Sequence, residues 1–118
     1  MLMVFPHPIS EPLAEVIAER FRVIGDPTRI RVLDRLREAS ATVGELQRDL
    51  GCSQQNASKH LGVLHRAGIV SRTKEGTAVR YAIADQSVFE ICELVCGGLR
   101  HQLDELAGIL DGAAAATS

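Results

Sequence analysis

Aromatic residues are scarce in this sequence, and tryptophan is absent. They make up 3% of the 118 residues, whereas proteins that bind single-stranded nucleic acid stack the bases on aromatic side chains. The scarcity therefore argues against a single-strand binder. The sequence also lacks a nucleophile elbow, a phosphate-binding loop and an HExxH motif, each of which carries a known type of catalysis. We expect that the protein is not an enzyme.

Long apolar runs are missing as well. No stretch approaches the ~18 apolar residues that span a membrane, so we expect no membrane partner. The apolar residues 2–5 have no basic segment before them, and Pro6 and Pro8 interrupt any apolar helix there, which argues against a signal peptide. A cytoplasmic location is therefore expected. In that reducing compartment the three cysteines predict no disulfide framework.

The sequence also lacks an excess of positive charge. The formal net charge is −2, which is unusual for a protein that binds nucleic acid. Between residues 53 and 81, however, several basic residues stand against the single acid Glu75. They are Lys59, Arg66, Arg72, Lys74 and Arg80. Local charge, not the total, decides attraction to DNA, so this segment is a candidate for DNA contact.

Residues 53–68 are predicted to form a short amphipathic helix around which the chain is organised. Ser53 is a good N-cap, and Gly68 supplies the left-handed residue that ends helices. Apolar residues repeat on one side at helical spacing, and polar residues occupy the other. The apolar set is Ala57, Leu61 and Leu64, and the polar set is Gln54, Gln55, Ser58, Lys59 and Arg66. This polar face matches the side chains that recognise bases and phosphates in the DNA major groove, although it also fits an ordinary solvated face.

Helix signals just before this segment predict a helix-turn-helix. Thr42 and Glu45 form a capping box, in which Glu45 reaches back to the Thr42 amide, and Gly51 ends the helix. Only residues 51–53 then separate the two helices, as in a helix-turn-helix. Residues 69–83 are two β-prone runs around a turn, which predicts a β-hairpin. This hairpin is the wing of a winged helix-turn-helix.

Helices are also predicted on both flanks. One begins at Pro12 and a second at Asp26-Pro27, an N-cap followed by proline. In the second, Arg29 and Arg31 are expected to be solvated, with phosphate contact as the alternative. Residues 85–110 carry an apolar stripe that is longer than a small domain needs for itself, so it predicts a partner surface.

The predicted fold class is mainly α with a small β-hairpin in a single domain. The composition, with 46% hydrophobic and 24% charged residues, is typical of a globular protein. The expected parts are an N-terminal extension at 1–11, the winged helix-turn-helix domain at 12–110 and a flexible tail at 111–118.

Several short motifs follow one another in a fixed order along residues 13–110. They include Gly25-Asp26-Pro27-Thr28-Arg29, Glu45-Leu46, Ser58-Lys59-His60-Leu61, Ala67-Gly68-Ile69-Val70 and Glu75-Gly76. Together they resemble the ArsR/SmtB family of winged-helix repressors. The resemblance implies a homodimeric transcriptional repressor, paired through its first and C-terminal helices, that leaves its operator when an inducer binds or modifies it. It also implies that the motif histidine His60 belongs to the DNA-facing side, where Ser53 and Asn56 are expected as well.

The expected partner is a double-stranded DNA operator. A two-fold dimer would place two recognition helices roughly 34 Å apart, near one turn of DNA, so the operator should be an imperfect palindrome. One alternative is a winged-helix module that binds another protein, because the fold does not by itself imply DNA binding. The other is a regulator of this fold with no metal response. The polar helix face and the basic wing favour DNA.

The metal-ligand sets of similar sensors are incomplete in this chain. Similar zinc sensors carry an Asp-x-His pair and a later His-x-x-His or His-x-x-Glu pair near the C-terminus. The corresponding residues here are Asp85, Ser87, Gly98 and His101. Similar arsenic, cadmium and lead sensors carry a Cys-x-Cys pair before the helix-turn-helix, where this chain has Thr42 and Gly44. Neither set can therefore hold its ion as it does in those sensors.

Cys92 and Cys96 are the remaining candidates for sensing. They are four residues apart and so share one helix face, where thiolates of two chains could converge on a thiophilic ion such as Zn(II), Cd(II), Cu(I) or As(III). Two other interpretations stay open: apolar packing, because free cysteine is among the most buried residues, and thiol redox sensing. Cys52 lies just before the recognition helix, whose dipole favours the thiolate form of the side chain. Three interpretations stay open for it: a structural residue, a reactive sensor or a third ligand.

Overall fold

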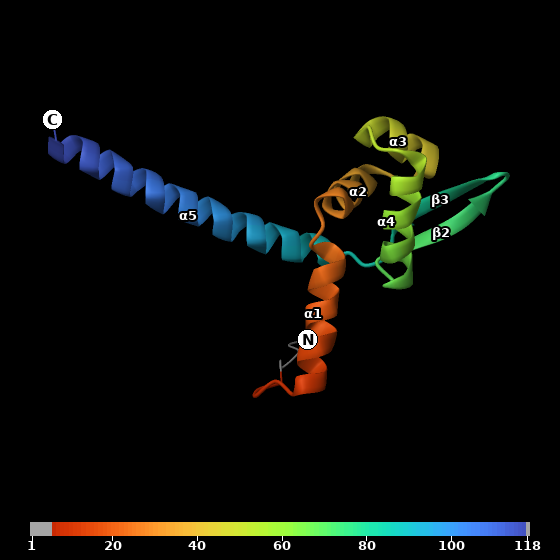
Figure 1. The fold of residues 1–118 in the computed structure, drawn as a ribbon, viewed down its shortest axis with the longest axis horizontal. Coiled ribbons are helices and arrows are strands. Elements are labelled where there is room, and N and C mark those ends of the chain that lie inside the picture. Colours follow the sequence, from red (N-terminus) through yellow and green to blue (C-terminus); the bar gives the residue numbers. More distant parts are fainter. Residues whose placement is uncertain (1–5, 118) are drawn as a thin grey trace. The chain divides into compact units, whose positions relative to one another are not determined.

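Five helices and three short strands make up residues 6–117, the part of the chain that this computed structural model describes (Figure 1). They are α1 (Glu11–Ile24), α2 (Pro27–Glu38), β1 (Ala41–Thr42), α3 (Val43–Leu50), α4 (Gln54–Arg66), β2 (Val70–Glu75), β3 (Ala78–Ile83) and α5 (Ser87–Thr117). The expected mainly α, winged helix-turn-helix architecture is confirmed. The chain divides into Met1–Asp85, which holds the helix-turn-helix and wing, and Gln86–Ser118, which holds α5. The apolar residues 2–5 and the last residue of the expected tail lie outside the described residues.

Each of the first four helices begins directly after a residue whose side chain accepts a hydrogen bond from an amide of the first turn. These N-caps are Ser10, Asp26, Thr42 and Ser53. In α4 the Ser53 hydroxyl accepts from the Asn56 amide at 3.1 Å. Gly51 has a φ of 68°, the left-handed conformation that closes α3. The predicted starts of α2, α3 and α4 are therefore confirmed.

The wing belongs to a three-stranded antiparallel sheet with the order β1-β3-β2. β2 and β3 pair with Arg72 opposite Tyr81, and the chain turns at Gly76, whose φ is 63°. The predicted hairpin is confirmed. The structure adds β1, whose Ala41 lies opposite Tyr81 on the other side of β3. A strand of two residues has no alternation for a sequence pattern to detect, yet here it joins the wing to the start of α3.

The helix-turn-helix and the wing share one apolar core. Its most deeply buried side chains come from α2, α3, α4 and the beginning of β2. They include Val32, Leu33, Leu46, Ala57, Leu61, Leu64, Ile69 and Val70. The apolar set predicted for α4 is 0% exposed, so its predicted inner face is confirmed. Burial of that face determines which side of α4 is left for solvent.

Helix α5 runs from Ser87 to Thr117, beyond the end predicted at residue 110. The apolar stripe stops there, but the residues that follow are mostly alanine, the strongest helix former, so the helix continues. Large apolar side chains along α5 are exposed: 56% of Leu99, 66% of Leu103 and 53% of Leu106 are accessible. Among the described residues, no helix is both long and apolar enough to span a membrane.

Candidate nucleic-acid interface

Helix α4 presents a continuous polar face to solvent. Its exposed residues in the cap and the first two turns are Ser53, Gln54, Gln55, Asn56, Ser58 and Lys59. Side-chain amides both donate and accept hydrogen bonds, as base edges in the major groove require, and a lysine ammonium pairs with phosphate. The structure therefore leaves the polar residues predicted for this part of the helix exposed on one surface, with the exception of His60.

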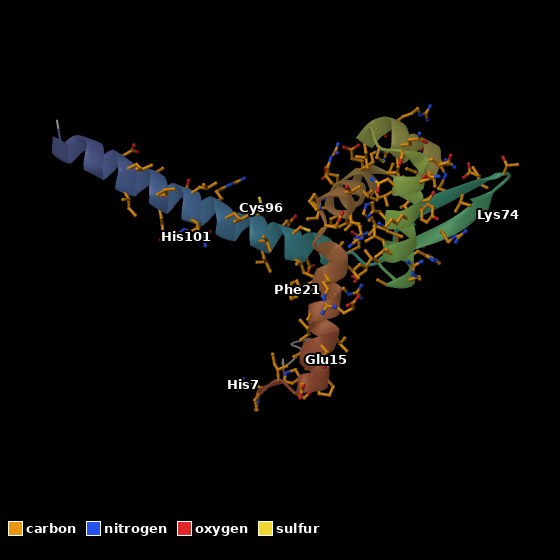
Figure 2. The ribbon with its side chains drawn as sticks, viewed as in Figure 1. His7, Glu15, Phe21, Lys74, Cys96 and His101 are labelled. Atoms are coloured by element: carbon orange, nitrogen blue, oxygen red, sulfur yellow. The ribbon has the colours of Figure 1, made fainter. Side chains whose placement is uncertain are left out.

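The wing adds exposed positive charge. Arg72 and Lys74 lie on β2 and are exposed, with Lys74 close to the hairpin turn (Figure 2). Neither side chain forms an ion pair with another residue of the described range 6–117. A hollow of about 360 Å³ between the wing and the helix-turn-helix is lined by residues that include Thr77 and Gln54. The wing and the start of α4 thus border the same concave surface.

Arg80 differs from the other predicted wing cations because its guanidinium is already paired. Nε donates to the Glu75 carboxylate at 2.7 Å, and Nη2 donates to the Glu45 carboxylate at 3.3 Å. The hydrogen bond from Arg80 lowers the pKa of Glu75, and the same bond raises the pKa of Arg80. The guanidinium therefore lies between two carboxylates, and the part of its charge that remains available to DNA is smaller than that of Arg72 or Lys74.

Glu45 also departs from the predicted capping box. The Thr42 hydroxyl accepts from the Glu45 amide at 3.2 Å, as predicted. The Glu45 carboxylate, however, faces Arg80 at 3.3 Å and Arg35 at 4.0 Å instead of reaching back to the Thr42 amide. Two guanidinium groups are stronger, charge-assisted partners than a backbone amide. Glu45 therefore ties α3 to the wing and to α2.

Arg66, in the last turn of α4, is exposed as predicted. Its Nη1 would lie 3.3 Å from a Cβ placed on Gly62. The guanidinium therefore lies back along the helix over the preceding turn, where the absence of a side chain at Gly62 leaves room for it. This conformation keeps the charge of Arg66 beside α4.

His60 is the main departure from the predicted interface. Its residue is 7% exposed and lies on the inner side of α4, not on the DNA-facing side. Nδ1 lies 3.2 Å from Nη1 of Arg29 and 3.8 Å from Oδ1 of Asp26. Arg29, which the sequence analysis expects to be solvated, is likewise half-buried. The missed signal is helical phase, because His60 follows the buried Ala57 by three residues and precedes the buried Leu64 by four.

The three cysteines are free thiols. Cys52, between α3 and α4, and Cys92 are half-buried, and Cys96 is exposed. On α5 the two thiols continue the 3.5-residue spacing of the leucines. This α5 seam consists of Cys92, Cys96, Leu99, Leu103, Leu106 and Leu110. Within the described residues, no three His, Cys, Asp or Glu side chains gather in an arrangement that could hold a metal ion.

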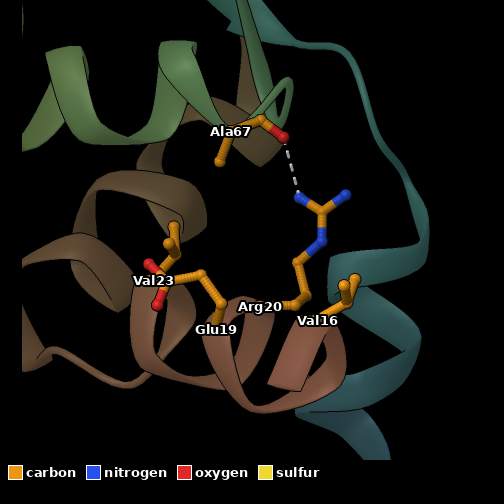
Figure 3. Close-up of a pocket in the computed structure, with 5 residues that line it drawn as sticks. All are labelled: Val16, Glu19, Arg20, Val23 and Ala67. Carbon is orange, nitrogen blue, oxygen red and sulfur yellow. Dashed lines mark hydrogen bonds between the residues drawn. The ribbon is translucent and has the colours of Figure 1, made fainter. Parts of the chain in front are cut away.

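Two residues at the positions of the zinc ligands of similar sensors have protein partners. Asp85 Oδ2 lies 3.8 Å from Arg20 Nη2, and His101 Nε2 lies 3.1 Å from Glu105 Oε1. Nη1 of Arg20 donates to the Ala67 carbonyl at 3.0 Å, beside a hollow of about 290 Å³ (Figure 3). Arg20 therefore links α1 to the end of α4.

Comparison with known proteins matches this geometry to transcriptional regulators. Residues 24–73 match the family model of a helix-turn-helix domain. Rv0081 of Mycobacterium tuberculosis, an uncharacterized HTH-type transcriptional regulator, is 38% identical over 103 residues, which cover 86% of this chain and 90% of that protein. The crystal structure of Rv0081 has a TM-score of 0.73 at 39% identity and covers 81% of this chain and 97% of that chain.

Two further solved structures are similar at 25% identity. One is the homodimeric winged helix-turn-helix DNA-binding domain of Mb0332 from Mycobacterium bovis, described as a possible ArsR-family transcriptional regulator, with a TM-score of 0.69 over 86% of this chain and 94% of that one. The other is the AntR antimony-specific transcriptional repressor, with a TM-score of 0.73 over 84% of this chain and 90% of that one. The similarity to known regulators therefore extends over most of the chain and is not limited to the helix-turn-helix.

Proposed function

The chain belongs to the ArsR/SmtB family of winged-helix, DNA-binding transcriptional regulators, and from this premise we propose that it is a homodimeric repressor released from its operator by a thiol-directed inducer. The observation that carries the proposal is the exposed polar face of α4, which lies opposite its buried apolar face. Its amides and hydroxyl suit base edges in the major groove. Lys59 on α4 and Arg72 and Lys74 on the wing suit the phosphates.

Substitution on α4 tests the assignment of the recognition helix. Gln54→Ala, Gln55→Ala and Ser58→Ala remove groups that contact bases without changing charge. The preference for operator over scrambled duplex, measured by fluorescence anisotropy, should fall about tenfold for a lost bidentate contact. Gln86→Ala, at an exposed position before α5, is the matched control and should keep the full preference. If all three α4 variants also keep it, the recognition helix lies elsewhere.

A second copy of the chain is the proposed partner of α5. The α5 seam repeats every 3.5 residues, as in coiled coils, and its leucines at 99, 103, 106 and 110 are more than half exposed in the single chain. Covering this apolar strip with another helix is favourable because it removes apolar surface from water. The homodimeric state of Mb0332 supports the same assembly. The two recognition helices would then lie roughly 34 Å apart, so we expect an imperfectly palindromic operator.

Cys92 and Cys96 are the proposed target of the inducer. Both lie on the α5 seam, so a dimer would bring two pairs of thiols toward one interface. Thiolates suit Zn(II), Cd(II), Cu(I) and As(III), and similarity to an antimony-specific repressor supports a thiophilic element. Oxidation of the same thiols is the second candidate. Either event would change the crossing of the two helices, and a coupling of about 1–3 kcal/mol would weaken operator binding about 5- to 150-fold.

Serine variants distinguish these mechanisms. Cys92→Ser and Cys96→Ser, singly and together, should still bind the operator but should no longer be released by the effective inducer. Titration with As(III), Cd(II), Cu(I) and Zn(II), and separately with peroxide, separates ion binding from oxidation. Cys52→Ser tests the turn cysteine and should respond like the wild type. If every variant keeps the wild-type response, or the wild type responds to none of these agents, the α5 thiols are packing residues.

A further inference from the structure

The guanidinium of Arg29 connects α2 with both α1 and α4. Its Nε donates to the Val23 carbonyl at 2.6 Å, and its Nη2 donates to the Arg22 carbonyl at 3.3 Å, both in the last turn of α1. Its Nη1 lies 3.2 Å from Nδ1 of His60 in α4. One planar side chain therefore holds the end of one helix and the inner face of another.

These contacts complete the C-terminal end of α1. The last four carbonyls of a helix have no donor within the helix. Here the carbonyls of Phe21 and Ile24 accept from the amides of Gly25 and Asp26. Arg29 supplies donors to the two carbonyls between them. A displacement of this end of α1 would therefore strain or break the hydrogen bonds of Arg29.

The contact between Arg29 and His60 has a defined polarity. Arginine has donors only, so in this contact Nη1 of Arg29 is the donor and Nδ1 of His60 is the acceptor. Because His60 is 7% exposed, loss of this partner would leave a polar nitrogen in the protein interior, which is unfavourable. Asp26 fixes the backbone at Arg29, since its Oδ1 accepts from the main-chain amide of Arg29 at 3.1 Å. With its three donors engaged as well, the guanidinium has little freedom to move.

From this geometry we propose that Arg29 and His60 are positioning residues that set the placement of α4 relative to α1 and so transmit changes at the dimer helices to the DNA-reading face. The inference rests on the proposed function, because it takes α1 as part of the dimer and α4 as the recognition helix. Arg29 acts through His60 and makes no DNA contact itself. A single-point donor cannot reproduce its three bonds, since they depend on the planar fork.

Four variants separate positioning from simple stabilisation. Arg29→Met and His60→Leu keep much of the bulk and remove the hydrogen bond, whereas His60→Asn retains an acceptor near the position of Nδ1. Operator affinity is measured at a temperature at which circular dichroism shows each protein to be folded. His60→Leu should bind about tenfold more weakly, the effect of one charge-assisted hydrogen bond. Arg29→Met removes that bond and the two bonds to α1, so its affinity should fall at least as far. Arg37→Met removes the same charge from an exposed position in the last turn of α2 and should bind like the wild type.

Non-additivity and rescue provide the decisive comparison. The double variant of Arg29→Met with His60→Leu should bind no more weakly than Arg29→Met alone, because Arg29→Met already removes the contact that His60→Leu removes. His60→Asn should retain most of the wild-type affinity. If Arg29→Met does not fold, Arg29→Lys replaces it, because it keeps the charge without the fork and should show the same loss.

Three results would overturn the inference. Folded variants with wild-type affinity but a lower unfolding temperature would show that the link is merely structural. Additive losses in the double variant would show that the two residues act separately. A salt slope reduced by about 0.9 for each lost phosphate contact in Arg29→Met would show that Arg29 touches DNA directly. A wild-type protein that binds no operator would overturn the proposed function, and this inference with it.

Discussion

The exposed cations of the wing lead to a quantitative prediction about salt. Arg72→Gln and Lys74→Gln each remove an exposed positive charge that has no ion-pair partner within the described range 6–117. A residue that neutralises one phosphate contributes about −0.9 to the slope of log K against log salt. A homodimer carries each residue twice, so each variant should reduce the steepness of that slope by about 1.8.

The expected effect is large enough to measure. From about 50 to about 200 mM salt the logarithm of concentration rises by about 0.6, so a slope difference of about 1.8 changes the ratio of wild-type to variant affinity about 12-fold. The deficit of each variant should therefore be greatest at low salt and should shrink as salt rises. Operator titrations followed by fluorescence anisotropy at several salt concentrations give both slopes directly.

The ion pair of Arg80 provides a control with unchanged net charge. The double variant Glu75→Gln with Arg80→Gln removes one charge of each sign. The Arg80 fork already donates to carboxylates at 2.7 and 3.3 Å, so the double variant should keep the wild-type slope. If Arg72→Gln and Lys74→Gln leave the slope unchanged as well, the wing does not lie against the phosphates, and the proposed DNA-binding mode is wrong.

Further variants test the dimer and the helix caps. Leu99→Glu with Leu103→Glu places charge in the α5 seam and should yield monomers in sedimentation equilibrium. Leu94→Glu, at a 77% exposed position outside the seam, is the control and should stay dimeric. If the double variant still forms a dimer, the proposed interface is wrong. Ser53→Ala removes the N-cap of α4 and should lower the free energy of unfolding in urea by about 1 kcal/mol, and no loss would mean that water replaces the cap. The backbone amide of Arg29 holds the pKa of Asp26 below its ordinary value, so the ionised carboxylate stabilises the fold at neutral pH. The contribution of this carboxylate is lost as pH falls through the lowered pKa, below the usual value of about 3.9. Asp26→Asn still caps α2 but should be less stable than the wild type at pH 7, and the difference in unfolding free energy should disappear in acid. A difference that stays constant with pH would contradict this assignment.

Local chemistry explains why much of the fold is predictable from the sequence. Ser53, Thr42 and Asp26 cap their helices because their side chains reach amides two or three residues away. Gly51 ends α3 because its left-handed conformation is open to glycine. The hairpin needs only a turn at Gly76 between two β-prone runs. None of these contacts depends on a distant part of the chain.

Side chains governed by tertiary contacts are not predictable in this way. The Arg29–His60 and Arg80–Glu45 contacts join residues 31 and 35 positions apart. A sequence pattern assigns such polar residues to solvent, because an unpaired charge is rarely buried. The phase of α4 does predict that His60 points inward, but its partner becomes visible only when the end of α1 and the start of α2 are brought beside it.

These pairings also explain how a chain with a net charge of −2 presents a basic surface. The acids nearest the proposed interface are engaged by arginines: Glu75 by Arg80 at 2.7 Å, Glu45 by Arg80 at 3.3 Å, and Asp49 by Arg35 at 2.6 Å. A carboxylate held beside a guanidinium contributes little repulsion at a distance, because the two opposite charges largely cancel there. The unpaired cations on α4 and β2 then dominate the local potential, which is the quantity that attracts DNA.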